Sequence, residues 1–255
     1  MGSNIITKNK EELEVMKEGG QFLSEIKAKL IDGVNEGVSA EEIDSLADSL
    51  IEKTGGEPSF KMVDKYSWAT CVNVNEGVVH GIPKKSTVFK KGDVVSVDVG
   101  LFYKGFHTDT SFTVAIDPDE KTQDFLKLGK KALKSGISKA LVGNRIYDIS
   151  KAIEDTLKEG GATAIRALVG HGIGEKLHED PQIPCFTSGR REDTPEIPKG
   201  AVFAIEVMYT MGDSGLGLDE DGWTISTQDD KIASLFEETV AVIGNGPLVL
   251  TGIRT

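Results

Sequence analysis

Four acidic side chains stand in apolar, strand-forming segments that contain no lysine or arginine to pair with them. Asp98 is flanked by two valines, Glu206 lies within the apolar run 202–208, and Asp109 and Glu237 occupy two further segments of this kind. Buried carboxylates are rare in proteins unless they pair with a cation or bind a metal. The alternative is that these acids face solvent at the edges of a sheet. This alternative explains a single acid more readily than four acids in a repeated pattern.

The segment 94–114 predicts a β-hairpin that brings two of these acids together. A two-residue turn is expected at 104–105, because its second residue is a glycine, which accepts the positive φ of such turns. With this turn Asp98 lies opposite Ser111, and Asp109 becomes its diagonal neighbour on the same face, about 7 Å away at Cα. Two carboxylates in a low-dielectric site repel each other, so a shared cation would stabilise the pair.

The acids recur in a repeated pattern of elements. A Lys-Gly turn, an apolar run and one carboxylate occur at 91–99 and again at 199–207, and a second strand follows each, at 106–116 and 234–243. Two helices precede each pair of strands. We expect these helices at residues 10–30, from the capping box of Ser39 and Glu42 to Gly55, at 120–141, and around 149–157 up to Gly160.

This pattern favours an α+β fold with two matched halves, about 1–118 and 119–255, in one domain. A central antiparallel sheet with helices packed on one side would accommodate it. Chance similarity between apolar strands is the alternative. The segments 181–200 and 211–222 contain proline and glycine and are expected to be surface loops that frame a site.

Composition excludes several classes of function. The chain has 29 basic and 41 acidic residues and a net charge of −12, which argues against a nucleic-acid-binding surface. No apolar run reaches the roughly 18 residues that a membrane span needs. The only cysteines, Cys71 and Cys185, make no disulfide framework, and the N-terminus shows no secretory signal, so we expect a reducing, cytoplasmic environment. Whether Gly2-Ser3 is native is left open.

A set of carboxylates with an imidazole and no thiolate suits Mn²⁺, Fe²⁺, Co²⁺ or Zn²⁺. The imidazole candidate is His171, which lies among glycines in a segment that we expect to be a flexible loop and which could instead be structural. Four carboxylates and one histidine exceed the needs of one ion and fit two ions about 3.5–4 Å apart. The helical zinc-protease signature, a phosphate-binding loop and a serine nucleophile turn are all absent from the sequence.

Taken together and in order, the motifs resemble those of the methionine aminopeptidases, in particular the type I, bacterial-like branch of the pita-bread metallopeptidases. The match runs over nearly the whole chain. Its pieces are Val74-Asn75-Glu76 to Pro83, Asp98-Val99-Gly100, Thr108-Asp109-Thr110, Gly170-His171-Gly172-Ile173-Gly174, His178-Glu179-Asp180-Pro181, Ile205-Glu206, Asp221-Gly222-Trp223-Thr224 and Phe236-Glu237-Glu238-Thr239.

The resemblance implies a pair of metal ions and a role for each ligand. Asp98 and Asp109 would hold one ion, Asp109 and Glu237 would bridge to the second, and His171 and Glu206 would also bind that second ion. A metal-bridging water would attack the first peptide bond. Of the two neighbouring acids, the family pattern places the ligand at Glu237, although a typical bacterial member has histidine where Glu238 stands in this chain.

The resemblance also implies catalytic and substrate-binding residues. Glu206 would carry the proton from the water. His178 would hydrogen-bond the scissile carbonyl as it becomes an oxyanion, and His80 would contact the scissile amide or the leaving amine. His107 matches no catalytic position and is expected to be a strand histidine beside Asp109. The methionine pocket would be lined by Tyr66, Cys71, Leu177 and Trp223, with departures from the family pattern at Leu177 and in residues 60–69.

The expected function is removal of the initiator methionine from nascent proteins and peptides that begin with Met. An Xaa-Pro aminopeptidase or dipeptidase of the same fold is the alternative, disfavoured because those relatives usually carry an additional N-terminal domain. A non-catalytic pita-bread binding protein is disfavoured because all five ligand positions are filled. We expect a monomer that binds neither DNA nor membranes. The sequence leaves open whether the ribosome is a docking partner and which metal is used.

Overall fold

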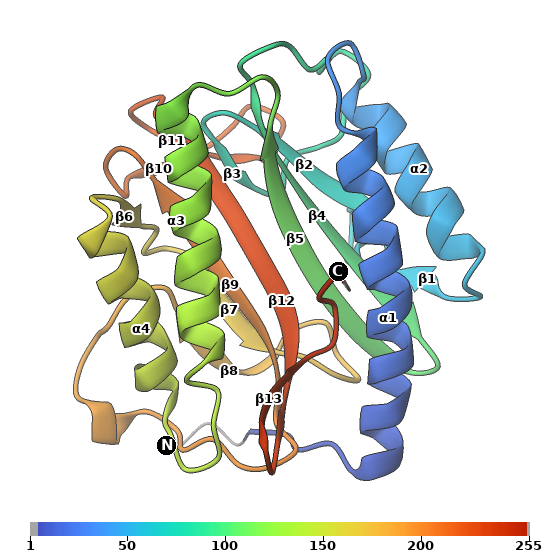
Figure 1. The fold of residues 1–255 in the computed structure, drawn as a ribbon. Helices are drawn as coiled ribbons and strands as arrows, with labels where there is room; N and C mark the ends of the chain where they lie inside the picture. The colour runs from blue at the N-terminus through green and yellow to red at the C-terminus, as the bar shows by residue number, and fades with distance from the viewer. Residues whose placement is uncertain (1–4, 254–255) are drawn as a thin grey trace.

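The computed structural model describes residues 5–253, and residues 1–4, including the Gly2-Ser3 pair, and 254–255 lie outside the described part. A large antiparallel sheet carries four α-helices on one of its faces, in two pairs (Figure 1). This is the α+β arrangement expected from the sequence. The helices are α1 (Lys10–Gly33), α2 (Ala40–Glu52), α3 (Glu120–Ile137) and α4 (Ile146–Glu159).

The main sheet has ten strands, with the central order β1-β4-β5-β12-β9-β7-β8. β2 joins it beside β4, β6 beside β9 and β13 beside β12, and a separate three-stranded sheet has the order β10-β11-β3. The strands are β1 (Glu57–Pro58), β2 (Thr70–Val74), β3 (Gly77–Val79), β4 (Val94–Tyr103), β5 (Phe106–Ala115), β6 (Thr163–Ala164), β7 (Val169–Gly172), β8 (Glu179–Pro184), β9 (Val202–Thr210), β10 (Leu216–Leu218), β11 (Ile225–Thr227), β12 (Ala233–Ile243) and β13 (Gly246–Val249).

The predicted start of α2 is confirmed, and the predicted end of α3 is wrong. The capping box at the start of α2 is confirmed: the Glu42 amide donates to Ser39 Oγ over 3.3 Å, and the Ser39 amide donates to the Glu42 carboxylate over 2.8 Å. The prediction that the third helix reaches residue 141 is wrong, because α3 ends at Ile137. The Asn144 side-chain amide binds the Lys139 carbonyl over 3.0 Å and closes the chain into turns there.

The predicted hairpin of β4 and β5 is confirmed in its register. Asp98 lies opposite Ser111, and the turn residues Lys104 and Gly105 have φ values of 48° and 92°. Positive φ at both positions matches the twist of the two strands. The segments expected to be loops at 181–200 and 211–222 are partly wrong, because β8 reaches into the first and β10 lies in the second.

The seam between β5 and β12 is short of backbone pairing and is completed by threonine hydroxyls. The two strands pair directly only at Glu237–Ser111 and Glu238–Thr110. On one side, Thr239 Oγ1 accepts from the Asp109 amide over 2.8 Å and donates to the Asp109 carbonyl over 2.7 Å. On the other side, Thr113 Oγ1 bonds the amide and the carbonyl of Leu235 in the same way. The seam therefore closes through side chains at the position of the acids.

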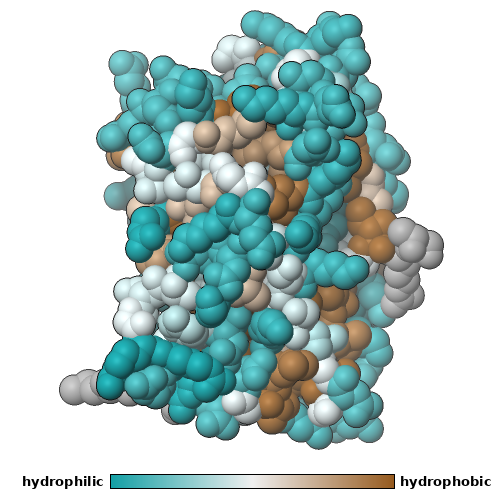
Figure 2. Space-filling model, turned by 60° about the vertical axis from the view of Figure 1, so that its left-hand side comes forward, coloured by the Kyte–Doolittle hydropathy of each residue, from teal (hydrophilic) through white to brown (hydrophobic). Residues whose placement is uncertain are grey.

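Each pair of helices covers its own part of the sheet with a hydrophobic core. The first core joins α1 and α2 to β4, and the second joins α3 and α4 to β9 and β12. The face shown in Figure 2 is mainly hydrophilic, with small, separate apolar patches. Within residues 5–253, none of the helices has the length and apolar character that crossing a membrane requires.

The packing of α1 predicts opposite effects for two adjacent glycines. A Cβ at Gly20 would lie 2.7 Å from the Leu250 carbonyl oxygen, whereas a Cβ at Gly19 would lie 3.5 Å from Tyr103 Cβ, an ordinary contact. Alanine favours a helix by about 1 kcal/mol over glycine, but overpacking against backbone costs about 1–3 kcal/mol. We expect Gly20→Ala to destabilise the protein and Gly19→Ala to leave its stability unchanged or raised, as measured by urea denaturation. A Gly20→Ala variant as stable as the wild type would contradict this packing.

Candidate functional site

Three strands of the main sheet bring together one buried group of possible metal ligands. Asp109 on β5, His171 on β7 and Glu237 on β12 each offer a ligand atom, and these atoms all lie within 4.8 Å of one another. All three residues are buried. The acids predicted from neighbouring elements of the sequence therefore converge with the glycine-flanked histidine at the middle of the sheet.

The other two predicted ligands lie beside this group. Glu206 on β9 is directly opposite Glu237 in the β9–β12 pairing, and Asp98 on β4 is the diagonal neighbour of Asp109 in the β4–β5 pairing. Asp98 is half-buried as a residue, but its Oδ1 atom is fully buried and has no hydrogen-bond partner. An orphaned buried carboxylate oxygen that faces other acids fits a bound cation.

Burial is the main cause of the raised pKa value of each of the four acids. Burial raises the pKa of Asp98 to about 7, against the effect of its hydrogen bonds to Asp109 and Glu237. Burial, followed by the charge of Asp98, raises the pKa of Asp109 and that of Glu206 well above the usual range; at Glu237 the charge of Asp109 comes second. Among the described residues, no lysine or arginine forms an ion pair with any of the four acids. Divalent ions would supply the missing positive charge.

His171 has the orientation of a metal ligand. Its Nδ1 lies 2.9 Å from the Gly172 carbonyl oxygen, and because a carbonyl only accepts, Nδ1 carries the proton. The Nε2 lone pair is then free to bind a metal, and the carbonyl holds the ring. Burial, together with the nearby His178, lowers the pKa of His171 to about 3, so the ring is neutral at pH 7.

The prediction that His171 lies in a flexible loop is wrong. It lies on β7, which pairs with both β8 and β9. The glycines around it serve close backbone approach: a Cβ at Gly170 would lie 2.7 Å from the Ala204 carbonyl oxygen, and one at Gly172 would lie 2.2 Å from that of Asp180. The absence of apolar alternation in this strand hid it from sequence analysis.

The remaining histidines follow β3, lie on β5 and precede β8. The rings of His171 and His178 have centroids 4.5 Å apart, and both His80 and His178 are exposed. His80 has a φ of 57°, an uncommon conformation for a side chain of this size. His107 is a strand residue on β5, as expected; it is buried, and its Nδ1 lies 2.9 Å from Ser59 Oγ.

The four residues expected to line the methionine pocket gather in one place. Tyr66, Cys71 and Leu177 are buried in one apolar cluster, and Trp223 packs against it, with its ring centroid 5.0 Å from that of Tyr66. Cys71 lies directly opposite Asp98 in the β2–β4 pairing, so this cluster adjoins the acids. The Tyr66 hydroxyl donates to the Thr70 carbonyl over 2.8 Å and is therefore engaged within the fold.

Two aromatic residues of this cluster, Trp68 and Phe60, were not predicted from the sequence. Trp68 packs against it, with its ring centroid 5.2 Å from that of Tyr66, and Phe60 is buried within it. Both lie in the segment 60–69 that departs from the family pattern. Its high aromatic content was the available signal, but only the folded chain places these rings beside Tyr66.

Asp221 holds two loops at the border of this cluster. Its Oδ1 accepts from the amides of Trp223 and Thr224 over 3.0 and 2.8 Å, and its Oδ2 lies 2.8 Å from Lys84 Nζ. Lys84 follows His80 closely in the chain. The aspartate therefore links the loop that carries Trp223 to the segment that carries His80.

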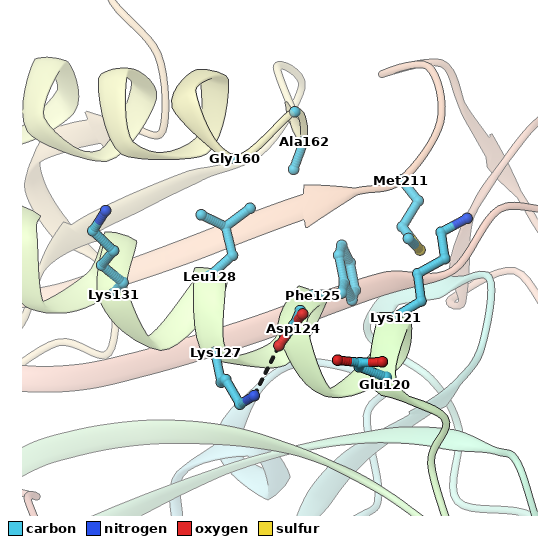
Figure 3. A pocket seen from close by; sticks show the side chains of 11 residues that line it. Glu120, Lys121, Asp124, Phe125, Lys127, Leu128, Lys131, Gly160, Ala162 and Met211 are labelled. Carbon is cyan, nitrogen blue, oxygen red and sulfur yellow. Dashed lines mark hydrogen bonds and ion pairs between the residues drawn. The ribbon is translucent and has the colours of Figure 1, made fainter.

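A separate groove of about 880 Å³ lies away from the acids, between α3, the end of α4 and the residue after β9 (Figure 3). Phe125, Leu128 and Met211 form its apolar floor, and charged residues of both signs form its edge. Asp124 and Lys127 pair with each other there over 2.8 Å. The groove contains none of the predicted site residues.

Known proteins match this chain in sequence over almost its whole length. The family model described as metallopeptidase family M24 matches residues 14–243. The methionine aminopeptidase of Clostridium perfringens is 39% identical over 251 residues, which cover 98% of this chain and 100% of that protein. Methionine aminopeptidase 1 of Bacillus subtilis is 36% identical over 98% of this chain and 100% of its own length.

Solved structures give the same result. The methionine aminopeptidase of Thermotoga maritima superimposes with a TM-score of 0.94 at 37% identity, over 98% of this chain and 100% of that one. The prolidase of Pyrococcus furiosus has a TM-score of 0.78 at 22% identity, over 98% of this chain and 66% of that one, and shares the fold alone. The chain therefore belongs to metallopeptidase family M24 and has the pita-bread fold.

Proposed function

We propose that this protein is a metal-dependent aminopeptidase that removes the N-terminal methionine from peptides and nascent proteins. The observation that carries the proposal is the buried group of Asp109, His171 and Glu237 next to an apolar cluster, in a chain that aligns with methionine aminopeptidases along nearly its full length. The group supplies metal ligands, and the apolar cluster supplies a place for an unbranched apolar side chain.

The residues that would hold two divalent ions are Asp98, Asp109, His171, Glu206 and Glu237. Asp98 and Asp109 would serve one ion, His171 and Glu206 would serve the other, and Asp109 and Glu237 would be common to both. Oxygen and imidazole donors suit cobalt, manganese, iron or zinc ions. Ions bound there lower the pKa of water and so make a nucleophile available near neutral pH.

The residues around the ligands position the peptide and move its protons. Glu206 accepts a proton from the attacking water, a role that fits a carboxylate whose pKa is raised by burial. His178 is exposed beside His171, and His80 is exposed directly after β3. His178 hydrogen-bonds the scissile carbonyl as negative charge develops on its oxygen, and His80 contacts the scissile amide or the leaving amine.

Tyr66, Cys71, Leu177 and Trp223 line the proposed pocket for the methionine side chain, and Trp68 and Phe60 belong to the same apolar cluster. An apolar pocket discriminates by only about 1–3 kcal/mol per methylene. Leucine at position 177, where an aromatic residue is common in the family, therefore changes the preference among apolar side chains without changing the reaction.

We also propose that the protein is a cytoplasmic monomer. Its single catalytic domain, residues 1–255, would consist of two halves of about 1–118 and 119–255. Strands from both halves share one sheet, which supports a single unit. Two free, buried cysteines suit a reducing compartment, where nascent chains begin. Docking on the ribosome is a further hypothesis, which co-sedimentation with ribosomes tests.

Peptide specificity is the direct test of the proposed function. With Mn²⁺ or Co²⁺ added, we expect the protein to release methionine from Met-Ala-Ser and to leave Ala-Pro peptides intact, because the apolar pocket adjoins the ligands. Product formation is followed by chromatography. Cleavage only before proline would support the prolidase-like alternative, and no cleavage with any divalent metal would support a binding protein.

Glu206→Gln tests the proton carrier. The amide keeps the size of the side chain but cannot accept the proton, so we expect kcat to fall by about 10²–10⁴-fold. Circular dichroism and the unfolding transition should remain close to those of the wild type. Glu25→Gln, at an exposed position of α1, is the matched control and should retain full activity. Substantial turnover by Glu206→Gln would contradict the assignment of Glu206 as the proton carrier.

Asp109→Asn tests the ligand assignment through stability. The metal-free wild type holds acids whose pKa values are raised by burial and by one another, and each pKa unit corresponds to about 1.4 kcal/mol. We expect the variant to be more stable than the wild type in EDTA by about 1 kcal/mol and to lose the stabilisation that Mn²⁺ confers. Asp155→Asn, an exposed control, should behave as the wild type in urea titrations under both conditions. Equal metal stabilisation of Asp109→Asn and wild type would contradict the assignment.

A further inference from the structure

An ion pair between a buried lysine and a partly buried glutamate lies behind the proposed ligands, on the face of the sheet that α1 covers. Lys27 Nζ on α1 is 2.6 Å from Glu238 Oε1 on β12, and Lys27 is only 3% exposed. Successive strand residues face opposite sides of a sheet, so Glu238 points to the helices while Glu237 points to the ligands. Desolvation makes such a pair costly, and an apolar pair of the same size is often as stable.

Lys27 departs from what its position predicts. Lys27 occurs on the buried face of α1, among the apolar residues Leu23, Ile26 and Leu30. The buried lysine and the partly buried glutamate therefore form a pair of opposite charges within the packing of α1 on the sheet.

The pair is connected to two of the proposed metal ligands through Thr110. Lys27 Nζ donates to Thr110 Oγ1 over 2.9 Å, and this hydroxyl donates to the Glu237 carbonyl over 2.8 Å. The Thr110 amide in turn donates to Asp109 Oδ1 over 3.0 Å. A single residue thus connects the lysine to the backbone of one proposed ligand and to the side chain of another.

A second connection runs from the other oxygen of Glu238. This oxygen, Oε2, accepts from Thr251 Oγ1, which itself accepts from the Thr239 amide over 2.9 Å. Thr239 is the residue whose hydroxyl closes the β5–β12 seam on Asp109. The ion pair is therefore connected to the β5–β12 seam at two places, through Thr110 on β5 and through Thr239 on β12.

The charges of the pair also matter to the acids on the other face. Burial lowers the pKa of Lys27, and the charges of Glu238 and Glu237 act to raise it. The lysine thus interacts with a proposed ligand as well as with its direct partner. Because Lys27 neutralises Glu238, a fifth carboxylate next to the four acids adds no net negative charge.

We propose that the Lys27–Glu238 pair is a positioning element that holds Asp109 and Glu237 in the geometry needed for tight metal binding. It acts through Thr110 and Thr239, across a seam with little backbone pairing of its own. The inference rests on the ligand assignment proposed above. It extends that assignment to residues on the opposite face of the sheet, which touch neither metal nor substrate.

Metal affinity, measured apart from activity, tests this proposal. Metal-free protein is titrated with Mn²⁺ by calorimetry in the full-length wild type and in Glu238→Gln, Lys27→Met and Thr110→Val. Partners that orient metal ligands typically contribute about 10–100-fold to affinity, so we expect Kd to rise about 10-fold or more in each variant. Thr110→Ser, which keeps the hydroxyl, should stay within about 3-fold of the wild type.

Ser24→Ala is the matched control on α1. Ser24 is also buried, but its hydroxyl donates to the Gly252 carbonyl over 2.8 Å and does not reach the seam. We expect this variant to lose some stability in urea while its Kd for Mn²⁺ stays that of the wild type. If Lys27→Met does not fold, because it leaves Glu238 unpaired, Thr110→Val and Glu238→Gln decide the question.

The outcomes separate the two proposals. Wild-type affinity in Glu238→Gln and Thr110→Val, with lower stability, would show that the pair serves the fold alone and would overturn the positioning role. Equal Mn²⁺ affinity of the wild type and Asp109→Asn would instead overturn the ligand assignment, and the positioning role with it. Weaker binding in both Thr110→Val and Glu238→Gln, with normal binding in Thr110→Ser, would support the inference.

Discussion

The mutual repulsion of buried carboxylates is the constraint on which the rest of this structure depends. Asp98, Asp109, Glu206 and Glu237 come from four adjacent strands, and burial and mutual charge raise the pKa of Asp109, Glu206 and Glu237. A fold accepts such an arrangement only when other interactions hold the strands in place and a cation compensates the charge. The helices on one face supply the packing, and the imidazole of His171 completes a donor set for divalent ions.

The seam between β5 and β12 is where packing and chemistry meet. Direct pairing there is limited to two positions, and Thr113 and Thr239 replace the missing backbone bonds on either side. A hydroxyl that both accepts and donates can replace backbone bonds of a regular ladder. The seam therefore keeps a defined register at the position of the acids, and Lys27 bonds to Thr110 on its helix face.

The proposed specificity pocket is made of residues other than the proposed metal ligands. The prolidase of Pyrococcus furiosus shares the fold at a TM-score of 0.78, so the sheet and helices do not distinguish the two activities. The apolar cluster of Tyr66, Cys71 and Leu177 lies at the side of the ligands, on β2 and on loops held by contacts such as those of Asp221.

The sequence by itself determined the elements whose signals are local. The turn at Lys104-Gly105 set the β4–β5 register and so placed Asp98 and Asp109 on one face, and the Ser39–Glu42 capping box set the start of α2. Tertiary structure alone decided that His171 lies on a strand, since its glycines serve contacts with residues distant in the chain. It also decided that Trp68 packs against Tyr66, because a separation of two residues does not by itself bring two rings into contact. Only the fold brings Lys27 to Glu238, because residues 211 positions apart leave no periodic pattern in either segment.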